Sequence, residues 1–569
     1  MQEAINALIQ STLSRMTDDG LFPADVTLSF KVERPREKEH GDFATNAALV
    51  NARHARMKPR DLAEKILAAL PEHQTLVDRW EVAGPGFINF FITKSRLRGL
   101  VTEIQDAGET YGRSTIGAGK RVQVEFVSAN PTGPMHVGHG RGAVLGDALS
   151  SILTAAGFEV EKEYYINDAG AQVKVLAHSL LIRYRALFGE SVTIPEGCYP
   201  GDYVIELAEV LKARDGDRWL SLSAQEMADP PDELVEFSIN AMMDIIKGDL
   251  KSIRIEFDHF FSEQTLHKEG GIDQAVQTLA DRELVYEGVL EPPKGKKLDD
   301  WEPRPQTLFR ASEHGDQVDR PLKKSDGSYT YFAADIAYHL NKAQRGFDRL
   351  INVWGADHGG YVKRVQVALE ALTGKKDLLD VKLVQMVNLT RGGEPVKMSK
   401  RSGTFVTLRE VIDEVGADPI RFWFLTRSAG SQLDFDLQLA VSKSNDNPVF
   451  YVQYAHARIH SVWRQLKERG IAKKWGSLDF LELDAEMDLI RMLSQYPENV
   501  ESAALSGEPH RVPFYLLELA AAFHAYYNGH RILVDDDDVR GARLALIDAV
   551  RQVLYNGLTL LGVEPREEM

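Results

Sequence analysis

From Arg121 to Ile166 the chain reads RVQVEFVSANPTGPMHVGHGRGAVLGDALSSILTAAGFEVEKEYYI, and this stretch decides the fold. Apolar and polar residues alternate over 122–127, which predicts a strand. Proline and glycine interrupt residues 130–134, and apolar residues then recur at helical spacing from Gly142 to a predicted helix stop at Gly157. Residues 158–166 predict a second strand. This order is typical of a parallel sheet that binds its ligand beside the helix N-terminus.

Two histidines lie in the loop that enters the helix. His136 and His139 flank Gly138, and Gly140 follows, so a large anion could approach the backbone closely. Imidazole donors beside a helix N-terminus indicate a phosphate site. For this segment alone two alternatives stay open, namely a metal pair and two structural histidines. No further Cys or His follows at zinc-ligand spacing, so we expect no zinc and no other metal held by the protein alone.

A second segment, KMSKRSGT at 397–404, carries three cations and on its own could be a solvated basic turn. Together with HVGH it resembles the HIGH and KMSKS signatures of class I aminoacyl-tRNA synthetases. The two departures, Val for Ile and Arg for the last Ser, remove no phosphate donor. The resemblance implies catalytic roles for His136, His139, Lys397 and Lys400, and ATP contacts at Gly138, Gly140, Gly355, Asp357, Met386 and Met398.

The composition agrees with a large globular protein. A chain of 569 residues predicts about two to four domains. With 44% hydrophobic and 27% charged residues, no long apolar run and no signal peptide, we expect no membrane segment. The single cysteine indicates a reducing compartment, so we expect a cytoplasmic protein. The net charge of −17 argues mildly against nucleic-acid binding but does not exclude a local basic surface.

Residues 1–112 predict a small separate α/β domain, with helices over 4–16 and 60–70 and strands over 26–32 and 87–92. The segments EKEHGDFATNAA (37–48) and GPGFINF (84–90) resemble the N-terminal extension of arginyl-tRNA synthetases. That resemblance implies contact with the D-loop corner of the tRNA.

Residues 113–430 predict a Rossmann-type catalytic domain, interrupted over about 205–300 by a polar, helical insertion. Strands are expected at 350–354 and 381–389, and Asp357, just after the first of these, could accept hydrogen bonds from a ribose. Residues 164–172, YYINDAGAQ, resemble a YxNDxGxQ segment of the same family. They could equally form a turn with a helix cap. The residues that could line the site are Ser128, Asn167, Asp168 and Gln172.

Two acids suggest which amino acid is bound. Glu125 ends the first strand, and Asp335 lies one helical turn after Tyr331, although Asp335 could also be a plain helix N-terminal acid. A guanidinium needs planar carboxylate partners, and an unpaired buried Glu125 would be costly, which itself suggests a cationic ligand. The family resemblance implies arginine-binding roles for Glu125, Asn130, Tyr331, Asp335 and His358.

Residues 431–569 predict an all-α bundle. Tyr451, Tyr454 and Arg458 fall on one helical face, which is more often core but could face tRNA. Segments DNPVFYVQYAHAR (446–458) and RLALIDAVRQVLYNGLTLLGV (543–563) resemble the anticodon-binding bundle of arginyl-tRNA synthetases.

The resemblance covers nearly the whole chain and implies a two-step reaction. L-arginine would be activated by ATP with Mg²⁺ and then transferred to the 2′-hydroxyl of the terminal adenosine of its tRNA, with activation requiring bound tRNA. The family's usual monomeric state is expected. Two alternatives remain: a class I synthetase for another amino acid or a related nucleotidyl transferase, and a non-catalytic tRNA-binding relative.

Overall fold

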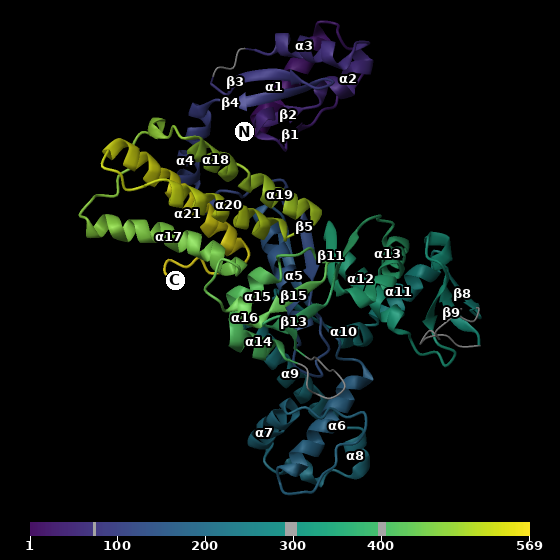
Figure 1. Cartoon of the computed structure of the whole chain (residues 1–569). Helices are drawn as coiled ribbons and strands as arrows, with labels where there is room; N and C mark the ends of the chain where they lie inside the picture. Colours follow the sequence, from purple (N-terminus) through teal and green to yellow (C-terminus); the bar gives the residue numbers. More distant parts are fainter. Residues whose placement is uncertain (72–74, 291–303, 397–405) are drawn as a thin grey trace.

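The computed structural model describes residues 1–71, 75–290, 304–396 and 406–569 and divides them into the three expected parts (Figure 1). A small domain at the N-terminus holds a four-stranded antiparallel sheet in the order β1-β2-β4-β3. Three helices complete it. The bounds are α1 (Gln2–Asp18), β1 (Val32–Glu33), β2 (Phe43–Thr45), α2 (Ala47–Ala55), α3 (Pro59–Ala69), β3 (Val77–Ala83) and β4 (Phe87–Ile92).

The strand predicted over 26–32 is wrong for most of its length, because only Val32 and Glu33 form β1. The backbone before β1 bonds to side chains instead of to a neighbouring strand. Asn51 bonds both the N–H and the C=O of Ser29, and the amide oxygen of Asn46 accepts from the N–H of Lys31 at 2.8 Å. These two asparagines therefore replace a ladder partner.

The centre of the molecule is a five-stranded parallel sheet in the order β12-β11-β5-β6-β7. Helix α5 connects β5 to β6 and packs very close to the sheet, since a Cβ at Gly146 would lie 2.2 Å from the ring of Phe126. The chain leaves β5 toward β6 on one side, and β11 lies on the other, so the strand order reverses at β5. Ligands bind at such a switch point. The bounds are β5 (Arg121–Glu125), α5 (Val137–Ala155), β6 (Glu159–Ile166), β7 (His259–Ser262), β11 (Arg349–Gly355), α13 (Gly359–Thr373) and β12 (Leu379–Val384).

The insertion predicted over 205–300 has the wrong extent, because β7 within it is the edge strand of the central sheet. Helices α6 to α9, before β7, project from the central sheet as one group. A three-stranded antiparallel sheet in the order β10-β9-β8 forms a second projecting group (Figure 1). A four-residue strand among polar helices has too little pattern to be recognised from sequence. The bounds are α6 (Ala171–Ala186), α7 (Tyr203–Asp215), α8 (Ala224–Ala228), α9 (Asp232–Ser252), α10 (Glu263–Lys268), α11 (Gly271–Ala280), β8 (Val285–Gly288), β9 (Gln306–Phe309), β10 (Arg320–Lys323) and α12 (Tyr331–Gln344).

The strand predicted over 381–389 is two strands in two sheets. β12 ends at Val384, and after Gln385 and Met386 the chain enters β13, the middle strand of a small sheet with order β14-β13-β15. The bounds here are β13 (Val387–Arg391), β14 (Glu394–Pro395), α14 (Leu408–Val415), α15 (Ala417–Trp423), β15 (Leu433–Asp436) and α16 (Leu437–Ala440).

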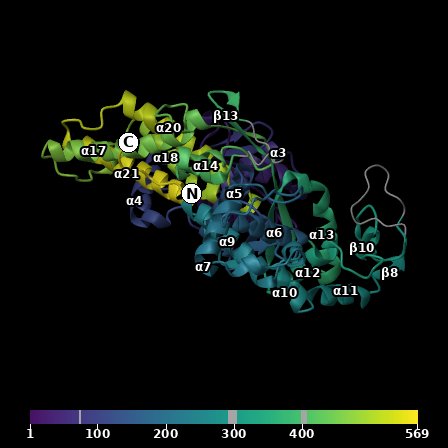
Figure 2. The same ribbon diagram turned by 90° about the horizontal axis from the view of Figure 1, so that it is seen from below.

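The C-terminal part is a helical bundle, as predicted. Helix α4, which follows the N-terminal domain, packs against α18 and α21 (Figures 1 and 2). Four consecutive aspartates at 535–538 lie at the start of the last helix, α21, and Asp536 caps it. Among the described residues, no helix combines the length and apolar character that crossing a membrane requires. The bounds are α4 (Lys94–Ala107), α17 (Pro448–Glu468), α18 (Asp484–Leu493), α19 (Tyr496–Ser506), α20 (Arg511–Gly529) and α21 (Asp537–Leu560).

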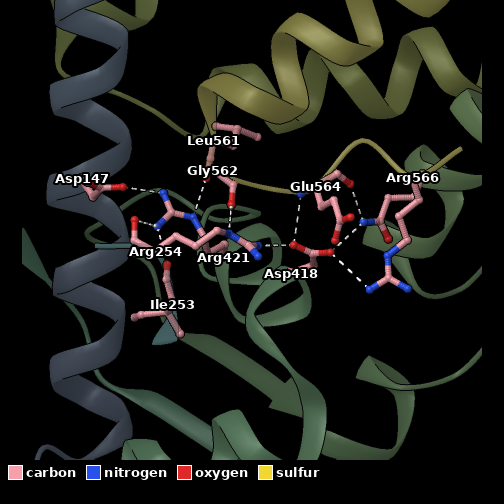
Figure 3. A network of polar contacts seen from close by, with 10 residues as sticks. Asp147, Ile253, Arg254, Asp418, Arg421, Leu561, Gly562, Glu564 and Arg566 are labelled. Atoms are coloured by element: carbon pink, nitrogen blue, oxygen red, sulfur yellow. Dashed lines mark hydrogen bonds and ion pairs between the residues drawn. The ribbon is translucent and has the colours of Figure 1, made fainter. Parts of the chain in front are cut away.

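A buried polar joint connects the bundle to the catalytic part (Figure 3). Arg421 of α15 is 1% exposed and donates to the carbonyls of Leu561 and Ile253, each at 2.8 Å, and to the carboxylate of Asp147 on α5. A Cβ at Gly562 would lie 2.3 Å from the guanidinium, and its φ of +67° also favours glycine. The end of α21 is therefore fixed to the helix that begins at the two histidines.

The N-terminal domain is also attached to the bundle. Arg34 forms a two-pronged ion pair with Glu498 at 2.7 and 2.8 Å, and Arg491 donates to Asp42 at 2.7 Å. Lys38 pairs with Asp488 at 2.7 Å, so part of the 37–48 segment faces the bundle.

Candidate active site

A cavity of about 870 Å³ opens at the carboxyl edge of the central sheet, at the switch point. Its walls come from the ends of β5, β6, β11 and β12 and from helices α5 and α12. Short loops after parallel strands therefore supply most of the polar groups, while the sheet beneath fixes their positions.

His136 and His139 form the entrance to α5. The backbone N–H of Gly138 donates to His136 Nδ1 at 3.1 Å, and the N–H of His136 donates to His139 Nδ1 at 3.3 Å. The two rings stack with centroids 3.7 Å apart. Because each Nδ1 accepts, the proton of each neutral ring is on Nε2, and both imidazoles are donors through that atom. Gly138 permits this geometry, since a Cβ there would lie 2.9 Å from the His136 ring.

The loop after β5 has an unusual backbone. Val127 and Ser128 have φ values of +68° and +41°, and the N–H of Ser128 donates to the carbonyl of Phe126 at 3.0 Å. Positive φ is strained for a β-branched residue, and such strain concentrates at functional sites. The turn brings the Ser128 hydroxyl within 3.0 Å of Glu125 Oε1, and Ser128 Oγ accepts from the N–H of Tyr165 at 3.1 Å.

Carboxylates gather on one side of the cavity. Asp335 on α12 lies on the wall and accepts from the hydroxyl of Tyr361. Burial is the main cause that raises the pKa of Asp335 to about 7; the Tyr361 hydrogen bond opposes this shift, and the nearby Glu263 and Glu125 add to it. Burial also raises the pKa of Glu263, which sits at the start of α10 beside Tyr165. In the part of the chain that the structure describes, neither Asp335 nor Glu263 pairs with a lysine or an arginine, which indicates a binding site for a cation.

Glu125 does have a cationic partner. Lys342, which is 0% exposed, donates to Glu125 Oε2 and, at 3.0 Å, to Asn352 Oδ1. The amide of Asn352 lies 2.9 Å from His339 Nε2, and His339 Nδ1 lies 2.7 Å from the carbonyl of Asp335. Burial, followed by the charge of Lys342, lowers the pKa of His339 to about 3, so this ring is neutral. Glu125 therefore needs no external cation, contrary to the prediction from its burial, because the fold supplies Lys342.

The opposite side of the cavity is lined by Gly355, Asp357 and His358, which follow β11, and by Gln385 and Met386, which follow β12. Asp357 and His358 project into solvent, with side chains 82% and 61% exposed. A Cβ at Gly355 would lie 2.4 Å from Asp357 Oδ1, so glycine allows this carboxylate to fold back over the strand end.

Profiles of known domains match nearly the whole chain. "Arginyl tRNA synthetase N terminal domain" matches residues 3–92, "tRNA synthetases class I (R), catalytic domain" matches 101–419, and "DALR anticodon binding domain" matches 452–569. The arginine–tRNA ligase of Magnetococcus marinus is 58% identical over 575 residues, covering 100% of both chains. The chain belongs to the arginyl-tRNA synthetase family. The arginine–tRNA ligase of Roseobacter denitrificans, another member, is 51% identical over 99% of both chains.

Solved structures of the family have the same fold. A putative arginyl-tRNA synthetase from Campylobacter jejuni superposes with a TM-score of 0.73 at 30% identity, covering 84% of this chain and 100% of that one. The Thermus thermophilus arginyl-tRNA synthetase gives 0.74 at 24% identity over 100% of both chains. A Mycobacterium tuberculosis methionyl-tRNA synthetase in complex with methionyl-adenylate gives 0.54 at 13% identity, over 79% and 92%, and shares the fold alone.

Most of the residues predicted for the site line this one cavity, although they come from distant parts of the sequence. They are Glu125, Ser128, Asn130, His136, Gly138, His139, Asn167, Asp335, Gly355, Asp357, His358 and Met386. Lys397, Met398 and Lys400 lie outside the described residues.

Four predicted residues do not line the cavity. Tyr331 is 68% exposed at the first position of α12, so it does not share the orientation of Asp335. Gly140 is buried for packing, since a Cβ there would lie 2.7 Å from Leu408. Asp168 accepts from the N–H of Gln264 at 3.0 Å and from Ser262 at the start of α10, so it does not cap α6, the helix that follows it, whose N-cap residue is Gly170 and which has no side-chain cap. Gln172 is exposed and accepts from Asn130 at 3.3 Å.

Several groups around the acids were not among the predicted site residues. Tyr338, His339 and Lys342 follow Asp335 at helical spacings of three, four and seven, so a polar face on α12 was a readable signal. Glu263 gave no usable signal, because it follows the unrecognised strand β7. Tyr361 reaches Asp335 only through the packing of α13 on α12.

A second cluster lies on the bundle. Tyr451, Tyr454 and Arg458 of α17 are half-buried and meet His524 and Tyr527 of α20. Arg458 lies 4.1 Å from the Tyr527 ring centroid and donates to Asn528 at 2.8 Å. The stripe is therefore a partly exposed seam between two helices and not interior core.

Proposed function

We propose that this protein attaches L-arginine to its cognate tRNA with ATP as the energy source. The observation that carries the proposal is that the carboxylates of Asp335 and Glu125 line the same cavity as the paired histidines, with Glu263 near enough to raise the pKa of Asp335. A planar guanidinium is the amino-acid cation that two carboxylates can hold with two-pronged hydrogen bonds.

The nucleotide would occupy the side of the cavity near α5. His136 and His139 would donate through Nε2 to phosphate oxygens at a helix N-terminus. Asp357 would accept from the ribose, and the backbone at Gln385 and Met386 would hold the adenine. Lys397, Lys400 and Met398 are proposed from sequence alone to complete this site. Mg²⁺ would arrive bound to ATP.

The arginine side would place the substrate's guanidinium against Asp335, whose carboxylate lines the cavity. Tyr361 orients Asp335 through its hydroxyl, and Lys342 neutralises Glu125 from below. Glu125 Oε1, Asn130 and His358 then face the cavity and could take the α-ammonium group. In this arrangement the guanidinium and the α-ammonium group of arginine each face either an opposite charge or neutral hydrogen-bonding groups.

Catalysis would require positioning of two anions and no protein nucleophile. The arginine carboxylate attacks the α-phosphate, pyrophosphate leaves, and the arginyl group then passes to the 2′-hydroxyl of the terminal adenosine of the tRNA. Donors aimed at the charge that develops on the phosphate are worth about 3 kcal/mol each, or on the order of 100-fold in rate. Tyr451, Tyr454 and Arg458 would present stacking surfaces to unpaired tRNA bases.

The setting of the reaction follows from the family. We infer a monomeric enzyme that works in the cytoplasm with other translation enzymes. Domain limits near residues 112 and 430 are proposed from the change in sequence pattern at these positions.

The direct test is charging of total tRNA by the purified protein with each amino acid in turn. We expect arginine alone to be incorporated, and incorporation of another amino acid in its place would refute the proposed substrate. We also expect pyrophosphate exchange with arginine to be negligible until tRNA is added. Robust exchange without tRNA would contradict only that requirement.

A further inference from the structure

Arg141 is a buried arginine with no obvious place in the proposed chemistry. It lies in α5 two residues after His139 and is 0% exposed. Nη1 donates to the carbonyls of Gln385 at 2.9 Å and Ser431 at 2.8 Å, and Nη2 donates to the carbonyl of Ser428 at 3.0 Å. Within the described ranges no carboxylate pairs with it. Burial lowers its pKa to about 10, which leaves it charged at neutral pH.

The three carbonyls lie where two strands begin. Gln385 lies between β12 and β13, two residues before β13 begins, and Ser428 and Ser431 form the turn before β15. The N–H of Gln385 donates to the carbonyl of Ala429 at 2.9 Å, and β13 pairs in parallel with β15. One guanidinium therefore fastens the starts of both strands to the second turn of α5.

One of these segments is part of the cavity. Gln385 and Met386 line it, and the methyl group of Met386 would lie 3.6 Å from a Cβ at Gly138. The same helix presents His136 and His139 at its first turn. Arg141 thus links the helix that carries the phosphate donors to the backbone proposed to hold the adenine.

We infer that Arg141 is a positioning residue for ATP, which sets the distance between the imidazoles and the Gln385–Met386 backbone. The inference rests on the proposed nucleotide side of the cavity. A planar fork can reach three carbonyls at once, whereas a lysine ammonium is a single point with a different reach. Arg141→Lys should keep the positive charge and lose the simultaneous hydrogen bonds to the three carbonyls.

The test compares Arg141→Lys with Arg421→Lys in the full-length enzyme with tRNA present. Arg421 is the matched control, because it is equally buried and also donates to backbone carbonyls, but at the joint with the bundle. KM values for ATP and arginine are measured by pyrophosphate exchange. The inhibition constant of adenosine, which lacks phosphates, reports on the base alone.

For R141K we expect the ATP KM and the adenosine inhibition constant to rise together by about tenfold, as for loss of one or two hydrogen bonds, with the arginine KM changed less than twofold. R421K should leave all three unchanged. Should R141K not fold, Arg141→Gln answers the same question, since it can still donate to one carbonyl.

Three results would overturn the inference. An unchanged adenosine inhibition constant in folded R141K would remove Arg141 from nucleotide positioning and leave the proposed function intact. An equal rise in R421K, or in the arginine KM, would mean a general loosening of the domain. If adenosine does not compete with ATP in the unaltered enzyme, the proposed adenine site itself fails, and the inference fails with it.

Discussion

The cavity acids and the interdomain joint are both buried charged clusters, but their charges are satisfied to different extents. At the joint, Asp418 accepts from Arg254, from the N–H of Glu564 at 3.1 Å, from Gln453 at 3.0 Å and from Arg566 at 3.4 Å. In the cavity, Asp335 accepts a hydrogen bond from the neutral hydroxyl of Tyr361, while burial and the neighbouring Glu263 and Glu125 raise its pKa.

This difference separates architecture from binding. Charges that the fold pairs fully hold domains together, and removing one partner leaves others without a bond. Charges that the fold leaves short of partners raise the free energy of the empty site, and a ligand of opposite charge removes that cost. Mutation of the cavity acids should therefore impair arginine use without destabilising the fold. Mutation of the joint should destabilise the fold and leave arginine use nearly unchanged.

The largest expected effect is on arginine use by Asp335→Asn. Loss of a desolvated charge partner should cost about 4 kcal/mol, so kcat/KM for arginine should fall on the order of a thousandfold. The melting temperature at pH 8 should hold or rise, because a carboxylate that is costly to ionise has been removed. Charging assays measure kcat/KM for arginine, and thermal unfolding measures the melting temperature. A large drop in melting temperature with little loss of arginine use would reverse the comparison.

Arg421→Ala should do the opposite. Removing it leaves the carbonyls of Leu561 and Ile253 without their donor and weakens the pairing of Asp147, which should destabilise the fold by about 3 kcal/mol. Thermal unfolding and limited proteolysis at the junction of α15 and α21 would detect this. Arginine KM, assayed well below the melting temperature, should stay within threefold of the unaltered value. A selective rise in that KM would place the joint within the binding site.

The smallest expected effect is a dependence of arginine binding on pH. Arginine should bind the ionised form of Asp335, whose pKa in the free protein is about 7. As pH falls below that value, the carboxyl is protonated before arginine binds, so the dissociation constant should rise by up to about tenfold per pH unit. Above pH 7 it should be nearly flat. Titration of arginine binding between pH 5.5 and 8.5 checks this, and the slope should vanish in Asp335→Asn.

The sequence predicted the three-part architecture because its signals are local. The β5–α5–β6 unit can be recognised from alternation, glycine and helical spacing between residues 121 and 166, and the structure confirms its strands and helix. His136, His139, Asp357 and Asp335 were recognised because each lies at a strand end or in a motif that resembles a known family. Such features depend on residues within a few positions of each other.

Other features depended on packing between distant segments. No residue near Glu125 in the sequence predicts its pairing with Lys342. The pair forms because α12 packs beside the end of β5. β7 joins the central sheet by pairing with β6, and Gln385, which lines the cavity at the end of β12, bonds through its carbonyl to Arg141 of the distant helix α5. Local sequence determined the strands and helix of the β5–α5–β6 unit and the loop that carries the histidine donors. Tertiary structure alone decided which buried charges are paired, since pairing depends on distances between segments that the chain brings together only on folding.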